Sequence, residues 1–275
     1  MEWRENELAA LFPSVAAQLR TGLSNIYLAA RMIAPGTQRE QSPELDERAA
    51  VLDQNYYRVL RLVNNLSAAS YLMDDRPLPL QSGDIVDLIG ENCAQAGDLA
   101  ALLGIQLSFQ TPVSYHQCRF HRDGMKLLVG QLLSNAVKFT ASGGRITVEL
   151  RFDEKAKLLI LSVTDTGCGI SEELLPTLFN RYYHQERRDP YPHGLGLGLP
   201  LCRRIAEGHG GSILAQSKPG RGSRFIVSIP DLPPVSDEVE VSDAFFDATG
   251  GFNPMLLALS DSLPLDAFHI RSDES

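Results

Sequence analysis

The sequence predicts an N-terminal antiparallel helical hairpin followed by an α/β sandwich domain. Two observations predict this fold class. Long apolar repeats at helical spacing fill the first 73 residues, and helical patterns mixed with pairs of strand-like runs follow up to residue 230. Of the 275 residues, 44% are apolar, which is enough to build a core in each part.

The predicted hairpin consists of two long amphipathic helices. Apolar residues recur in steps of three and four between Leu8 and Ile33, and steps of four and three alternate between Leu45 and Met73. The second repeat has a period of 3.5 residues, which favours supercoiling against other helices. Because an isolated hairpin cannot fully bury two such stripes, we expect residues 1–76 of two chains to form a dimeric four-helix bundle. Packing against the chain's own C-terminal domain is the alternative.

Residues 77–230 form the second predicted domain. Helices mixed with strand pairs on short turns indicate a sheet that is covered on one face by helices. The expected elements are a helix at 84–103, strands at 105–110 and 115–120, a helix at 122–139, strands at 146–152 and 158–163, a helix after 197, and strands at 212–215 and 225–229.

Residues 231–275 are expected to be an acidic, flexible tail with one or two short apolar docking segments. They hold ten acidic residues and one basic residue, which accounts for the net charge of -9 and leaves the rest of the chain balanced. A balanced body argues against nucleic-acid binding. The four cysteines are scattered, and neither a signal peptide nor an apolar run of membrane-spanning length is visible. We therefore expect a cytoplasmic protein without membrane insertion.

Two glycine-paced turns in the second domain indicate a ligand site. The turn Asp165–Ile170 follows an apolar run, and the turn Gly194–Leu199 opens a helix. Glycine lets the backbone approach a ligand because it has no Cβ, and the N–H groups at a helix start can face an anion. A nucleotide is the simplest ligand that needs both features. For each turn taken alone, a plain connection between strand and helix is the alternative.

A polar stripe on the helix at 122–139 supports a nucleotide. Gln131, Asn135 and Lys138 stand at i, i+4 and i+7, so they share one face of an otherwise apolar helix. An amide oxygen suits Mg²⁺, and an ammonium group suits a phosphate. A solvated stripe is the alternative interpretation.

Four motifs together resemble the N, G1, F and G2 boxes of bacterial sensor histidine kinases. They occur in that family's order and at its spacing, and two later segments, His209–Gly211 and Gly220–Phe225, resemble its closing strand hairpin. The resemblance covers residues 84–230 and implies the ATP-binding α/β sandwich shared with chaperone and topoisomerase ATPases. The four motifs are Asn135-Ala136-Val137-Lys138-Phe139-Thr140, Asp165-Thr166-Gly167-Cys168-Gly169-Ile170, Leu178-Phe179-Asn180-Arg181-Tyr182-Tyr183 and Gly194-Leu195-Gly196-Leu197-Gly198-Leu199.

The resemblance implies ATP and Mg²⁺ as cofactors and gives several residues a role. The adenine end would involve Asp165, which accepts the amino hydrogen, with Gly167 and Gly169 giving the base room. The phosphate end would involve Asn135 and Gln131 at Mg²⁺, Lys138 at phosphate, Arg181 at the γ-phosphate, and Gly194, Gly196 and Gly198 around the phosphates. Two positions depart from the family pattern: Gln131 stands where many members have a second asparagine, and Leu195 where serine or threonine is common.

The predicted hairpin resembles the dimerisation and phosphoacceptor domain of the same family. Residues 16–23 align with Ser-His-Glu-Leu-Arg-Thr-Pro-Leu, but Ala17 occupies the position of the histidine and Gln18 that of the acidic residue. An alanine has no nucleophile, and an amide cannot accept the proton. Because the chain has no histidine before His116, the phosphoacceptor is expected to be absent.

We therefore expect a kinase-like signalling protein that binds Mg-ATP within a two-component system and does not phosphorylate itself on the usual histidine. The expected partners are a second copy or a related kinase, and the receiver domain of a response regulator. Two alternatives stay open. The chain could phosphorylate a partner's histidine in trans or hydrolyse ATP, or it could be a non-catalytic adaptor or inhibitor.

Overall fold

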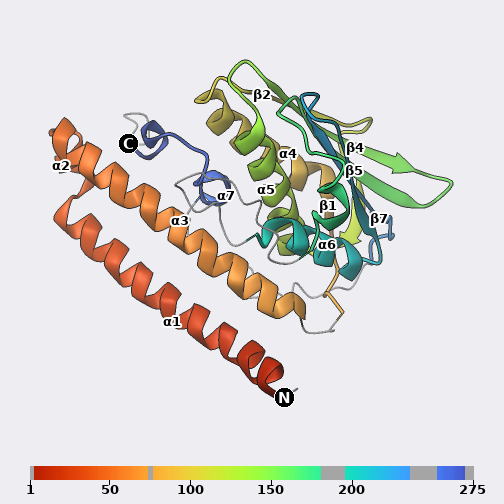
Figure 1. The fold of residues 1–275 in the computed structure, drawn as a ribbon, viewed down its shortest axis with the longest axis horizontal. Coiled ribbons are helices and arrows are strands. Elements are labelled where there is room, and N and C mark those ends of the chain that lie inside the picture. The colour runs from red at the N-terminus through yellow and green to blue at the C-terminus, as the bar shows by residue number, and fades with distance from the viewer. Residues whose placement is uncertain (1–2, 74–76, 181–195, 236–252, 270–275) are drawn as a thin grey trace.

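The computed structural model describes residues 3–73, 77–180, 196–235 and 253–269. In Figure 1 a long helical hairpin lies along one side of a sheet domain, and the sheet domain's helices face the hairpin. None of the helices in the described ranges combines the length and the hydropathy that a membrane crossing requires.

The hairpin is made of α1 (Trp3–Ile33) and α3 (Pro43–Met73), joined through the short helix α2 (Gly36–Arg39). The two long helices pack along their length, with Tyr27 stacked on Tyr56 at 4.3 Å between ring centroids. Towards the other end, the Arg20 guanidinium donates to Ser67 Oγ (3.2 Å). Both long helices of the sequence prediction are therefore present as an antiparallel pair.

Arg39 organises the turn of the hairpin. Its side chain is almost fully buried, and its guanidinium pairs with Asp46 (2.8 Å) and Asp53 (2.7 Å) of α3. A third hydrogen bond runs to the backbone carbonyl of Phe268 (3.0 Å), near the other end of the chain. Because a buried cation is tolerated only when it is paired, this network fixes the turn against both α3 and the C-terminal segment.

The sheet domain is built on a five-stranded sheet with the order β2-β4-β5-β7-β6. Strands β2 and β4 are parallel and all other neighbours are antiparallel. Alternate residues of β4, β5 and β7 are buried, as expected for a sheet with one covered face. The strands are β2 (Gln106–Gln110), β4 (Arg145–Asp153), β5 (Leu158–Asp165), β6 (Ser212–Ser217) and β7 (Ser223–Pro230).

Three helices cover the buried face of this sheet, as Figure 1 shows: α4 (Ile85–Ala101), α5 (Arg122–Phe139) and α6 (Gly198–Gly208). The helix expected at 122–139 has those bounds, and the sequence prediction of a mixed sheet with helices on one face is confirmed. Two elements of the sheet domain were not predicted. The strand β1 (Gln81–Asp84) pairs with β3 (Gln117–Phe120) in a separate small sheet, and a 3-10 turn, η1, spans Leu175–Thr177.

The C-terminal segment at 253–269 is docked rather than extended in solvent. It forms α7 (Pro254–Leu259) and a 3-10 turn, η2 (Leu265–Phe268). In Figure 1 this segment lies between α3 and the helices α4 and α5. The apolar run that the sequence suggests as a docking segment therefore packs against the rest of this chain.

Candidate functional site

Asp165 stands at the end of β5, where three segments of the chain meet. Only 5% of the residue is exposed, and Oδ1 accepts hydrogen bonds from the backbone N–H groups of Gly167 (2.8 Å) and Ser223 (3.2 Å). The second bond ties the turn after β5 to the first residue of β7. Among the described residues both hydrogen bonds to this carboxylate end on Oδ1, so Oδ2 is left for a ligand.

Burial raises the pKa of Asp165, and the hydrogen bonds from the two backbone N–H groups lower it. The larger effect is the loss of hydration, which disfavours the charged form. A carboxylate in such a place gains more from a ligand's N–H donor than an exposed one does, because the surroundings screen the interaction less. The site therefore suits a ligand with a donor, such as an exocyclic amine.

Three glycines let backbone segments pass close to Asp165. A Cβ on Gly167 would lie 2.3 Å from the carbonyl oxygen of the last residue of α5. A Cβ on Gly169 would lie 2.0 Å from the Lys218 carbonyl oxygen, and one on Gly222 would lie 2.0 Å from the Asp165 carbonyl oxygen. The last two glycines also have positive φ angles, +71° and +80°. These contacts bring the turn after β5 against both α5 and the β6–β7 turn, and no larger residue fits there.

The polar stripe of α5 borders this turn, but its three members have different surroundings. Asn135 and Lys138 are half-buried, whereas Gln131 is buried. Gln131 Nε2 donates to Asn65 Oδ1 of α3 (2.7 Å), and a Cβ on Gly198 would lie 2.7 Å from Gln131 Oε1. Gln131 thus links the hairpin to the start of α6, while the Asn135 side chain has no hydrogen-bond partner among the described residues.

The start of α6 can face an anion. Its N-cap residue is Leu197, so no side chain caps the first backbone N–H groups of the helix. Gly196 has a φ of +64°, and Gly198 is the first residue of the helix. Two other predicted site residues, Gly194 and Arg181, lie outside the described residues.

The hairpin contacts the helix that carries the polar stripe. The Arg61 guanidinium of α3 donates to Ser134 Oγ of α5 (3.0 Å), one helical turn from the bond between Asn65 and Gln131. Arg61 also pairs with Asp261 of the C-terminal segment. Sequence reasoning missed these contacts because 66 or more residues separate the partners and no local pattern marks Arg61 or Asn65.

The position of the expected phosphoacceptor is exposed on α1. Both Ala17 and Gln18 are exposed, and the Ala17 carbonyl accepts a hydrogen bond from Thr21 Oγ1 (3.0 Å) within the helix. Arg20 is directed to α3, where it donates to Asn64 Oδ1 (3.3 Å). Positions 17 and 18 are therefore open to solvent, but they carry neither a histidine nor a carboxylate.

The histidines His121 and His209 are structural. His209 is buried, with Nδ1 at 2.7 Å from the Ile205 carbonyl and Nε2 accepting the backbone N–H of His121 (2.9 Å). Burial lowers the pKa of His209 to about 4, so the ring is neutral at pH 7, with Nδ1–H donating to Ile205. His121 in turn caps α5 by accepting the N–H of Gly124 (2.9 Å).

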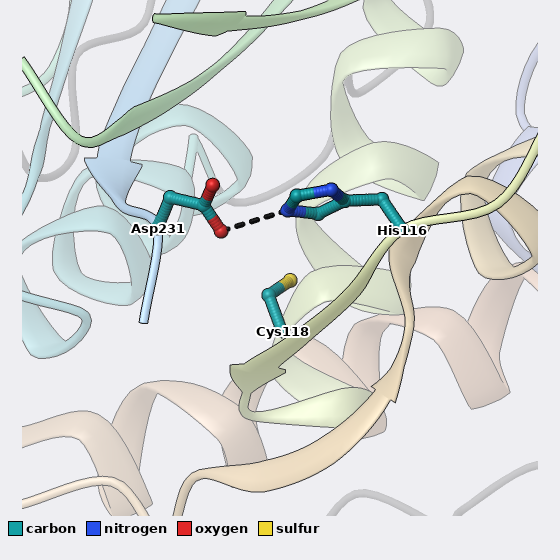
Figure 2. Close-up of side chains that lie close together, drawn as sticks. All are labelled: His116, Cys118 and Asp231. Atoms are coloured by element: carbon teal, nitrogen blue, oxygen red, sulfur yellow. Dashed lines mark hydrogen bonds and ion pairs between the residues drawn. The ribbon is translucent and has the colours of Figure 1, made fainter. Parts of the chain in front are cut away.

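Figure 2 shows a cluster of His116, Cys118 and Asp231. His116 Nε2 lies 2.8 Å from Asp231 Oδ1, and the imidazole ring packs on Phe152. Burial raises the pKa of the Cys118 thiol to about 12, so the sulfur is protonated at neutral pH. The potential ligand atoms of the three side chains lie within 4.8 Å of one another, close enough for a metal, but a hydrogen bond between His116 and Asp231 beside a neutral thiol accounts for the cluster. The pair anchors the end of β7 to the small sheet.

Comparison with known families assigns this domain. Residues 121–233 match the family described as histidine kinase-, DNA gyrase B-, and HSP90-like ATPase. This stretch contains α5, Asp165, the glycine turns and the strands β4 to β7. Residues 121–233 are therefore similar to the ATPase domains of this family.

Individual relatives are sensor proteins. The chain is 27% identical over 280 residues to the aerobic respiration control sensor protein ArcB of Escherichia coli (strain K12), an alignment that covers 99% of this chain and 34% of ArcB. It is 32% identical over 223 residues to the sensor protein SrrB of Staphylococcus aureus (strain N315), covering 79% of this chain and 37% of SrrB. The chain thus spans about a third of the length of these relatives.

Solved structures share the fold. Full-length ShkA in complex with AMPPNP superposes with a TM-score of 0.63 at 22% identity, over 82% of this chain and 47% of ShkA. The catalytic domain of the histidine kinase ThkA superposes with a TM-score of 0.50 at 25% identity, over 57% of this chain and all of that domain. The chain is thus a relative of sensor histidine kinases.

Proposed function

We propose that the chain binds ATP with Mg²⁺ and acts in two-component signalling without a phosphoacceptor at position 17. The observation that carries the first part is the buried Asp165 carboxylate, which has Oδ2 left for a donor among glycines that let backbone come close. Adenine has such a donor in its exocyclic amine. The family of the domain supports the same ligand.

Different residues of this chain would contact the adenine end and the phosphate end of the nucleotide. Asp165 accepts the adenine amino hydrogen, and Gly167 and Gly169 leave room for the base. At the other end, Asn135 supplies an amide oxygen to Mg²⁺ and Lys138 an ammonium group to phosphate. The bound ion neutralises phosphate charge and holds the phosphates in place.

The remaining predicted contacts complete this proposal. Gln131 lies next to Asn135 on the stripe, although in this arrangement its amide is bonded to Asn65. Gly194, Gly196 and Gly198 wrap the phosphates ahead of α6, and Arg181 stabilises charge on the γ-phosphate. Because Asn135 has no side-chain partner among the described residues, it is the better candidate for the metal.

We assign residues 1–76 to a dimerisation hairpin, 77–230 to the ATPase domain and 231–275 to a C-terminal segment. An exposed apolar stripe on the hairpin supports a homodimer, because its members on each helix recur at heptad spacing and would meet a second copy. The stripe contains Leu19, Ile26 and Ile33 of α1 (48%, 62% and 77% exposed) and Leu52 and Val59 of α3 (38% and 42%).

Nucleotide binding is tested by thermal unfolding with and without Mg-ATP. A ligand at a hundred times its Kd adds about 2.7 kcal/mol to the free energy of unfolding, so millimolar Mg-ATP should raise Tm measurably. The variant Asn135→Ala, at a half-buried position, should show a smaller rise in Tm with Mg-ATP. An unchanged Tm at millimolar Mg-ATP would instead favour a non-catalytic adaptor or inhibitor of a kinase or response regulator.

The missing phosphoacceptor is tested by incubation with γ-labelled ATP. We expect the purified protein to stay unlabelled, because Ala17 has no nucleophile and Gln18 no basic carboxylate. The double variant Ala17→His with Gln18→Glu restores both groups on the exposed surface of α1 and should acquire acid-labile phosphate. Acid-labile label on the unmodified protein would contradict the proposal.

Phosphorylation of a partner in trans is the second candidate. It is favoured by the combination of a built nucleotide site with an exposed, inert position 17, since such a domain can still present a phosphate to another chain. Mixing the protein with candidate kinases and receiver domains should transfer label to the partner's histidine. If the partner's histidine is labelled only when this chain is absent, phosphorylation of the partner in trans is excluded.

A further inference from the structure

The C-terminal segment 253–269 is a built element of the fold. Asn253 caps α7, with its side-chain oxygen accepting the N–H groups of Met255 (2.9 Å) and Leu256 (3.1 Å). Five apolar side chains of the segment are buried, which a solvated tail would leave exposed. These are Met255, Leu257, Leu259, Leu263 and Phe268, each with at most 7% of its surface exposed.

One side of the segment packs on the ATPase domain at the helix that carries the polar stripe. A Cβ on Gly130 of α5 would lie 3.3 Å from Ala258 Cβ and 3.4 Å from Met255 Cε. A glycine at this position lets α7 lie close against α5. The segment also contacts α4.

The other side is held by polar side chains of α3 at helical spacing. Gln54 donates to the Leu263 carbonyl (3.0 Å), and Arg58 donates to the Ser260 carbonyl (3.3 Å). Arg61, one turn further along the same face, pairs with Asp261. The segment therefore bridges the hairpin and the ATPase domain along most of its length.

Arg61 connects this bridge to the proposed nucleotide site. Its guanidinium pairs with Asp261 on one side and donates to Ser134 of α5 on the other (3.0 Å). The charges of Asp261 and Arg61 also act on Lys138, raising and lowering its pKa respectively, while burial is the largest cause and lowers it. The phosphate end of the site and the C-terminal segment are therefore electrostatic neighbours.

We propose that residues 253–269 form an autoinhibitory latch that holds the ATPase domain on α3 of its own chain. Position 17 lies on α1, and in Figure 1 α3 stands between α1 and the ATPase domain. A domain held there is separated by α3 from position 17 of its own chain, so it brings a phosphate to that position only when the latch opens. The consequence for phosphoryl transfer rests on the proposed function, whereas the latch itself does not.

The test compares two exchanges of charge in the full chain. Asp261→Arg replaces the partner of Arg61 with a like charge, and Asp266→Arg makes the same change of charge at an exposed residue of η2, five positions away. Both side chains are outside the buried core, so neither variant should unfold the protein. Hydrogen exchange at backbone amides, without nucleotide, reports on the latch.

In the unmodified chain the amides of 255–269 should be protected. Asp261→Arg should speed their exchange about tenfold, together with that of the α3–α5 contact, since an ion pair is lost and a repulsion gained. Asp266→Arg should leave both unchanged, and β4, β5 and β7 should stay protected in every variant. Unprotected amides at 255–269 in the unmodified chain, or equal exchange in the two variants, would overturn the latch.

A second readout separates the latch from the proposed function. In the background of Ala17→His with Gln18→Glu, Asp261→Arg should speed labelling by γ-labelled ATP relative to Asp266→Arg. Faster exchange with unchanged labelling would overturn autoinhibition. If no variant binds or transfers nucleotide, the proposed function fails, and the exchange experiment still decides whether the segment holds the two parts together.

Discussion

Replacing Asp165 with asparagine should weaken nucleotide binding and leave the fold intact. The asparagine carbonyl can take over the role of Oδ1 and accept the N–H groups of Gly167 and Ser223. Its NH₂ group then stands where Oδ2 was, so a donor faces the donor of the ligand. The variant therefore separates the two functions of this carboxyl group.

The size of the effect follows from the hydrogen bond that is lost. A hydrogen bond to a charged acceptor contributes about 1.5–3 kcal/mol, so the affinity for Mg-ATP should fall about tenfold to a hundredfold. Calorimetric titration with Mg-ATP measures the affinity, and urea unfolding measures stability. The free energy of unfolding of Asp165→Asn should stay close to that of the unmodified protein.

Asp165→Ala is the matched control. It leaves two buried N–H groups without their acceptor, at about 1–3 kcal/mol each, so the free energy of unfolding should fall by about 2–6 kcal/mol. Refutation would take one of two forms. Asp165→Asn could bind Mg-ATP as tightly as the unmodified protein, or Asp165→Ala could be as stable as Asp165→Asn.

Three further predictions concern stability. Gly169→Ala should lower Tm much more than Gly220→Ala, because both have positive φ (+71° and +72°) but only at Gly169 would the Cβ meet another atom within 4 Å; equal Tm values would refute the contact. Since burial lowers the pKa of His209 from 6.5 to about 4, the unfolded chain binds the extra proton in that range, and the free energy of unfolding should fall by at most about 3 kcal/mol as pH drops from 6.5 to 4. Urea unfolding across this range should show a weaker pH dependence in His209→Gln, and an identical dependence would contradict the assignment. Arg39→Met should cost about 3–5 kcal/mol in urea unfolding, because two carboxylates lose their cation in a buried place, and a loss below 1 kcal/mol would mean that the pairs are solvated.

Local periodicity was enough to predict most of the fold. The helix at 122–139 and the strand pairs of the sheet could be read from apolar spacing because each buries one face against a single core. The strand β1 could not. Its four residues are all half-exposed and show no alternation, so only its pairing with β3, more than thirty residues later, makes it a strand.

The site was predictable in part for the same reason. Asp165 and the glycines of its turn lie together in the sequence, so their chemistry is visible there. The acceptor bond to Ser223 spans 58 residues and the bond between Gln131 and Asn65 spans 66, and neither leaves a local signature. The docked position of 253–269 depends in the same way on Gly130 and on side chains of α3.

The bridge between α3 and the C-terminal segment also sets an order for folding during synthesis. The carbonyl groups that accept hydrogen bonds from Gln54 and Arg58 are synthesised 209 and 202 residues later. At about 5–20 residues per second, this face of α3 stays uncovered on the ribosome for about 10–40 s. A purely apolar face would promote aggregation over that time. Glutamine and arginine side chains instead keep this part of α3 hydrated until the C-terminal segment is synthesised. We therefore expect the polar anchors of the segment to limit aggregation of the nascent chain as well as to hold the folded one.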